Sequence, residues 1–178
     1  LAAQLPHVKR LIEAFNIPVI ECPGWEADDV IGTLARKADA EGGYETFMVT
    51  PDKDFAQLVT DTTRIYKPGR QGSAPEILDR AAICDNWQVD DPLQTIDILG
   101  LWGDASDNIP GVPGVGEKTA KKLVAQFGSM EALLESTDQL KGKQKENVEN
   151  NKEQALLSKK LVTIMTDAPV KVGFDEIK

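Results

Sequence analysis

The feature that most constrains this chain is a change in its hydrophobic pattern near residue 90. Before that point, short runs of β-branched and apolar residues alternate with helical stripes. The pattern predicts strands at residues 17–22, 47–49 and 63–66, and helices at residues 6–15, 26–38, 55–59 and 75–84. Strands that alternate with helices along a chain are typical of an α/β fold with a parallel sheet.

Beyond residue 90 the pattern predicts helices only. They are expected at residues 93–102, 118–127 and 130–135, followed by one long polar helix over residues 143–165. We therefore predict two parts. Residues 1–90 form a partial parallel sheet with flanking helices, and residues 91–178 form an all-helical subdomain.

The net charge of −9 argues, taken alone, against a nucleic-acid partner. The charge is, however, unevenly distributed. Residues 1–110 hold 9 Lys and Arg against 19 Asp and Glu, whereas residues 111–160 hold 9 Lys against 7 acidic residues. An acidic half is thus joined to a mildly basic half, and the acidic half requires an explanation.

The sequence has no apolar run long enough to span a membrane and no signal-peptide pattern. Cys22 and Cys84 lie far apart among apolar neighbours, which is typical of free thiols in a reducing compartment. These features predict a cytoplasmic protein with no membrane partner.

Seven carboxylates stand in three short groups: one at the start of a predicted helix, one just after a strand, and one in a loop after a helix. They are Glu26, Asp28 and Asp29; Asp52 and Asp54; and Asp104 and Asp107. Each group has an ordinary explanation, because acidic side chains favour the first helical turn and cap helices. The first two groups, however, lie where ligands of α/β sheets collect. Their joint placement therefore favours one shared site.

Oxygen ligands without His or Cys suit Mg²⁺ or Mn²⁺ and disfavour zinc. Two such ions about 4 Å apart can activate a water and stabilise the leaving oxygen of a phosphodiester. The carboxylates therefore predict a metal-dependent phosphodiesterase.

A glycine-rich stretch at residues 111–120 joins two predicted helices. Glycines let backbone amides approach a ligand closely, and the N-terminus of the following helix attracts phosphate. The stretch predicts a site that binds the phosphates of the DNA backbone without recognising the base sequence. A plain structural corner between helices is the alternative. The candidate DNA-binding residues are Gly111, Gly114, Val115, Gly116, Lys118, Thr119, Lys121 and Lys122.

These stretches resemble the 5′-nuclease family of flap endonuclease relatives. The match is nearest to the branch that forms the 5′→3′ exonuclease domain of bacterial DNA polymerase I. The motifs that carry it are GWEADDV at residues 24–30, TPDKD at 50–54, GDASDNIPG at 103–111 and GVGEKTA at 114–120. They occur in the family's order and cover nearly the whole chain.

The resemblance implies an enzyme that hydrolyses DNA at 5′ flaps or nicks in replication and repair. It places the seven carboxylates in a two-metal catalytic site for Mg²⁺ or Mn²⁺. It makes residues 111–120 a helix-hairpin-helix-like (H3TH) element that grips duplex DNA, often with a K⁺ ion. It also implies a covalently linked polymerase domain.

The family opens with a strand that carries an Asp, then a second Asp and a basic arch, and none of these precedes Leu1. We therefore expect a fragment that binds DNA with weak or no cleavage. The sheet edge beside the missing strand is expected to be covered by a neighbouring chain or to be locally disordered. Two alternatives stay open: a non-catalytic, sequence-independent duplex-binding module, and a stand-alone 5′→3′ exonuclease.

Overall fold

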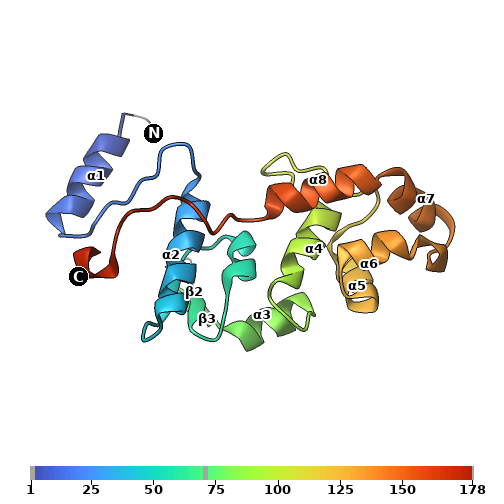
Figure 1. Cartoon of the computed structure of the whole chain (residues 1–178), viewed down its shortest axis with the longest axis horizontal. Helices are drawn as coiled ribbons and strands as arrows, with labels where there is room; N and C mark the ends of the chain where they lie inside the picture. Colours follow the sequence, from blue (N-terminus) through green and yellow to red (C-terminus); the bar gives the residue numbers. More distant parts are fainter. Residues whose placement is uncertain (1–2, 70–71, 178) are drawn as a thin grey trace.

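The computed structural model describes residues 3–69 and 72–177. Figure 1 shows an elongated molecule, with the sheet and α2 toward one end and α5, α6 and α7 at the other. The first part comprises α1 (Leu5–Ala14), α2 (Ala27–Glu41), β1 (Thr46–Val49), the 3-10 helix η1 (Lys53–Leu58), β2 (Thr63–Lys67), β3 (Glu76–Leu78) and α3 (Arg80–Trp87).

The sheet of the described residues has the strand order β1-β2-β3. β1 and β2 are parallel, with Val49 opposite Tyr66. β3 runs antiparallel to β2, with Leu78 opposite Ile65. The α/β fold class is therefore confirmed, while the sheet is mixed and its parallel part is limited to β1 and β2.

The helix predicted over residues 75–84 is wrong in its first half. Residues 76–78 pair with β2 instead of coiling. The side chain of Asp79 then accepts a hydrogen bond of 2.8 Å from the amide of Ala82, so α3 begins only at Arg80.

The strand predicted at residues 17–22 is also wrong, since no described strand includes it. Pro18 and Pro23 lack the amide hydrogen that a sheet ladder needs. Half-buried Ile20 and Cys22 instead pack against a small apolar cluster around Val30. The cysteines are free, as expected.

The helix predicted at residues 6–15 is confirmed as α1, although it buries none of its described residues. Leu11 and Phe15 on its apolar face are 59% and 71% exposed. β1 is likewise an open edge within the described chain, with Phe47 and Val49 exposed. This open, regular strand differs from the prediction of a sheet edge that is covered by a neighbouring chain or locally disordered.

The second part contains α4 (Gln94–Trp102), α5 (Glu117–Phe127), α6 (Met130–Glu135), η2 (Thr137–Gln139), α7 (Gly142–Asn150), α8 (Lys152–Val162) and η3 (Phe174–Ile177). The long helix expected over residues 143–165 is two helices. Asn151 leaves the helical region with φ −124°, and its side chain donates to the carbonyl of Asn147. An Asn that bonds to nearby backbone favours such a break.

One apolar core runs through both parts. It extends from Met48 and Phe55 through Ile98 and Leu99 in α4 to Met130 in α6. The division at residue 90 stays a prediction, because the packing is continuous across it. None of the described helices combines the length and the apolarity that crossing a bilayer requires.

After α8 the chain continues in the same direction and crosses α2, as the red segment of Figure 1 shows. The hydroxyl of Thr33 in α2 accepts a 3.0 Å hydrogen bond from the amide of Ala168. The buried amide of Gln57 in η1 donates to the carbonyl of Val162 and accepts from the amide of Ile164. These bonds place residues 162–165 beside the end of β1 and the start of α2. The first two acidic groups lie at these two positions.

Candidate metal centre and nucleic-acid interface

The turn after β1 orients the second acidic group. The amide of Asp52 donates to the hydroxyl of Thr50 at 3.1 Å. The carboxylate of Asp52 in turn accepts the amide of Asp54 at 3.0 Å and so begins η1. The first turn of η1 holds the Asp54 side chain 13% exposed beside the end of the strand.

A closed loop orients the third group. The backbones of Asp104 and Ile109 exchange two hydrogen bonds, of 2.9 and 2.7 Å. The Asp104 carboxylate accepts the amide of Ser106 at 2.7 Å, and Asp107 stands exposed in the loop between. The backbones of Gly103 and Gly111 lie in close contact at the base of this loop. A Cβ atom on Gly111 would lie 2.5 Å from the Gly103 nitrogen, so a side chain there would clash.

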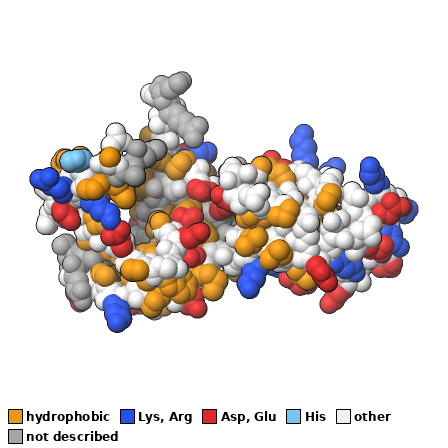
Figure 2. Space-filling view, turned by 90° about the horizontal axis from the view of Figure 1, so that it is seen from above, with side chains coloured by type: hydrophobic (Ala, Val, Ile, Leu, Met, Phe, Trp, Pro, Cys, Tyr) orange, Lys and Arg blue, Asp and Glu red, His pale blue; other side chains and the backbone are white. Residues whose placement is uncertain are grey.

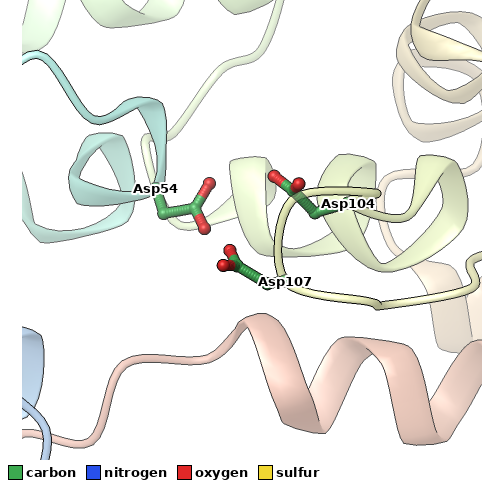
Figure 3. Close-up of side chains that lie close together, drawn as sticks. All are labelled: Asp54, Asp104 and Asp107. Atoms are coloured by element: carbon green, nitrogen blue, oxygen red, sulfur yellow. The ribbon is translucent and has the colours of Figure 1, made fainter.

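Figure 3 shows Asp54 from η1 facing Asp104 and Asp107 from this loop. One carboxylate oxygen from each of the three lies within 4.8 Å of the others. The side chains come from segments about fifty residues apart in sequence, so the fold itself assembles the cluster.

A pocket of about 340 Å³ opens beside this cluster. Six of the seven predicted carboxylates line it, together with Ile109 and the end of α8: Glu26, Asp28, Asp29, Asp52, Asp54 and Asp107. Asp104 is the seventh and joins them through the cluster with Asp54 and Asp107. Figure 2 shows acidic side chains gathered near the middle of the long molecule.

The crowding of acids raises two pKa values. Burial raises the pKa of Asp28, and the negative charges of Asp52 and Glu26 raise it further. Burial also raises the pKa of Asp54, although the neighbouring Lys53 ammonium works against that shift. Both carboxyls therefore favour a positive charge in their surroundings.

Lys53 is a site residue that the sequence reasoning missed. Its ammonium contacts the carboxylates of Asp104 and, at 3.2 Å, Asp54. The hydrogen bond from Lys53 is the main cause of the lowered pKa of Asp104. The signal was present in the sequence, because Lys53 stands between Asp52 and Asp54.

Asp29 has structural partners as well as a place on the pocket. One of its carboxylate oxygens accepts the amide of Met165 at 2.9 Å, and the other accepts the amide of Glu26 at 3.3 Å. It therefore fastens the C-terminal segment to the start of α2.

The donor set fits hard divalent cations. The ionisable side chains that line the pocket are all carboxylates, and those of Asp28 and Asp107 accept no hydrogen bond within the described residues. Burial raises the pKa of both Asp28 and Asp54, so the pocket disfavours their charged forms unless a cation lies nearby. Cations that prefer oxygen ligands would supply that positive charge.

The glycine stretch forms a tight corner before α5. Pro113 accepts a 2.7 Å hydrogen bond from Asn147, and the backbone of Gly111 bonds to both Ser158 and Gln154. Gly111 and Val115 are buried, whereas Gly114 and Gly116 are exposed. The sequence reasoning missed these bracing side chains on α7 and α8, because their contacts are long-range.

The predicted lysines of the corner differ in availability. Lys118 and Lys122 are exposed, and the half-buried Thr119 lies between them. The ammonium of Lys121 is turned toward α3, where it donates to the carbonyl of Asn86 and lies 5.3 Å from the Trp87 ring. Lys121 therefore has a structural role beside any role in binding.

With this fold and this carboxylate pocket, the chain belongs to the 5′-3′ exonuclease family. Residues 1–88 match its N-terminal resolvase-like domain, and residues 90–178 match its C-terminal SAM fold. The chain is similar to DNA polymerase I of Bacillus subtilis (strain 168), with 47% identity over 174 residues. That match covers 97% of this chain and 20% of the relative. The chain thus spans about a fifth of the length of the curated relatives it matches.

Solved structures show the same likeness. The T5 5′-exonuclease with bound divalent metal ions (zinc) is 26% identical, with a TM-score of 0.72, over 90% of this chain and 59% of that chain. A bacteriophage T5 flap endonuclease variant, in a pseudo-enzyme-product complex with DNA and metal ions, is 26% identical. Its TM-score is 0.69, over 86% of this chain and 56% of that chain.

Proposed function

We propose that this chain carries the divalent-ion site of a 5′ nuclease that hydrolyses DNA phosphodiesters at 5′ flaps or nicks in replication and repair. One observation carries the proposal: carboxylates from three separate motifs converge on one pocket. Membership of the exonuclease family and the likeness to DNA polymerase I support it. A polymerase domain is the proposed covalent neighbour.

The carboxylates are proposed to form two ion-binding sites. Asp54, Asp104 and Asp107 would hold one ion, since their oxygens already approach one another. Glu26, Asp28 and Asp52 would contribute to a second, while Asp29 positions the start of α2. Mg²⁺ is the preferred ion and Mn²⁺ its substitute, and such ions supply an activated water and offset charge on the leaving oxygen.

The helical part, residues 91–178, is proposed to hold duplex DNA through the corner before α5. The first amides of α5, at Glu117 and Lys118, have no acceptor within the helix and carry the positive end of its dipole. Lys118 and Lys122 add charge beside them. A K⁺ ion is proposed at this corner, where backbone carbonyls of the glycine stretch would hold it and it would help to bind a phosphate.

The test is the affinity of the chain for a fluorescent 5′-flap DNA, measured by anisotropy in Ca²⁺ and in EDTA. We expect Ca²⁺ to strengthen binding, and the double substitution D54N/D107N to remove that gain while leaving binding in EDTA unchanged or stronger. A DNA affinity that changes neither with Ca²⁺ nor with the double substitution would contradict the proposal.

The chemistry is tested with the same DNA and Mn²⁺. If the pocket catalyses cleavage, D54N/D107N should abolish it. Cleavage that persists in D54N/D107N would come from another source. A non-catalytic duplex-binding module is the second candidate function, favoured by the exposed first turn of α5. It predicts DNA binding that depends on Lys118 and Lys122 alone and is insensitive to divalent ions.

A further inference from the structure

A lysine in the middle of a carboxylate cluster is an unusual neighbour for a cation site. Lys53 lies in the first turn of η1, between Asp52 and Asp54. Its ammonium contacts Asp54 and Asp104, two of the three carboxylates whose oxygens converge. The side chains of those partners are 13% and 6% exposed, so water screens the contact only in part.

The contact occupies the carboxylates that would bind an ion. An ammonium and a divalent cation cannot both lie between Asp54 and Asp104 without strong repulsion. Lys53 itself is 39% exposed and lies 5.9 Å from the Trp102 ring, at the open side of the cluster. Its flexible stem can carry the ammonium into water when the carboxylates take another partner.

Resting on the proposed metal function of the cluster, we propose that Lys53 is a built-in counter-cation. It neutralises Asp54 and Asp104 in the ion-free protein, and a divalent ion must displace its ammonium to bind there. Lys53 is therefore a positioning residue that sets the ion affinity of the cluster.

The direction of one change separates this role from a merely structural ion pair. If Lys53 only oriented the carboxylates, its removal would loosen them and weaken ion binding. A counter-cation that competes with the ion has the opposite effect, because its removal frees the ligands and deletes a repelling charge.

The experiment is calorimetric titration of Mn²⁺ into four proteins: the original chain, K53M, K53R and K67M. Lys67 pairs with Glu76 at the end of β2, so K67M removes one positive charge away from the cluster. We expect K53M to bind Mn²⁺ about fivefold more tightly, the upper end of what one partly exposed ion pair contributes. K53R and K67M should stay within about twofold of the original chain. Equal or weaker binding by K53M would overturn the proposal.

Thermal unfolding in EDTA gives a readout without metal. K53M should melt at a lower temperature than K67M, because its acids lose their counter-charge, and Mn²⁺ should raise its melting temperature more. If K53M does not fold in EDTA, K53Q keeps a neutral donor for Asp104 and allows the same comparison.

The two proposals fail in distinguishable ways. If D54N lowers Mn²⁺ affinity while K53M behaves like K67M, only the role of Lys53 is wrong. If neither the original chain nor K53M binds Mn²⁺, the metal function of the cluster and the Lys53 proposal are both wrong.

Discussion

Gln57 joins the acidic turn after β1 to the end of α8, and its replacement should loosen both. It lies in η1 and is 2% exposed. Its amide nitrogen donates to the carbonyls of Asp54 at 3.0 Å and Val162 at 2.8 Å, and its oxygen accepts the amide of Ile164 at 2.9 Å. One side chain thus satisfies three backbone groups behind the metal centre.

Gln57→Ala would leave those groups without their partner. A buried polar group that loses its hydrogen bond costs about 1–3 kcal/mol, and the three here are only partly reachable by water. We therefore expect the free energy of unfolding to fall by roughly 3–4 kcal/mol, measured by equilibrium unfolding in urea.

Gln94→Ala is the matched control. The side chain of Gln94 also makes three hydrogen bonds, with the amides of Asp90 and Asp91 and the carbonyl of Gly128, but two are exposed and the one with Asp91 is only partly buried. Water can replace them, so its loss should be about 1 kcal/mol. Equal losses for the two alanine variants would refute the view that buried bonds of Gln57 fasten this region.

Three further predictions concern single features. D91N should reduce stability at neutral pH by roughly 0.5 kcal/mol, because the backbone bond from Leu93 and the Arg80 ion pair lower the pKa of this 43% exposed carboxyl. The folded pKa is below the unfolded one, so the stability difference in urea titrations should shrink and vanish as the pH falls through the folded pKa of Asp91. Gly111→Ala should cost more than about 2 kcal/mol in the same assay, since φ is +60° and the added carbon meets the backbone of α4. Gly128→Ala, with φ +82° and open space, should cost about 1 kcal/mol. K118A/K122A should weaken duplex binding and should reduce the slope of log affinity against log salt concentration by the amount of about two phosphate contacts. K121A should mainly lower stability, because the Lys121 ammonium bonds to Asn86. Equal losses of binding in K118A/K122A and K121A would contradict these different roles.

The sequence predicted the elements whose signals are local. The helical stripe of α2 begins at an acidic turn and ends at Gly42 with φ +71°, all within one stretch of sequence. The second and third acidic groups follow β1 and α4 directly, so their placement could be inferred from element ends. The structure brings these groups together; their roles as ligands stay a prediction.

Some of the errors concern features that depend on distant partners. β3 is three residues long and exists because β2 lies beside it. Residues 17–22 look like a strand in isolation but have no ladder among the described residues. The ion pair between Lys53 and Asp104 joins residues 51 positions apart, which no local pattern encodes.

The most direct measurement of the central claim is anomalous X-ray diffraction from crystals of the chain soaked in Mn²⁺. We expect a Mn²⁺ peak between Asp54, Asp104 and Asp107, with carboxylate oxygens as its ligands. The Lys53 ammonium should have moved away from Asp104. Mn²⁺ bound elsewhere, with Lys53 still in contact with Asp54 and Asp104, would contradict the proposed metal site.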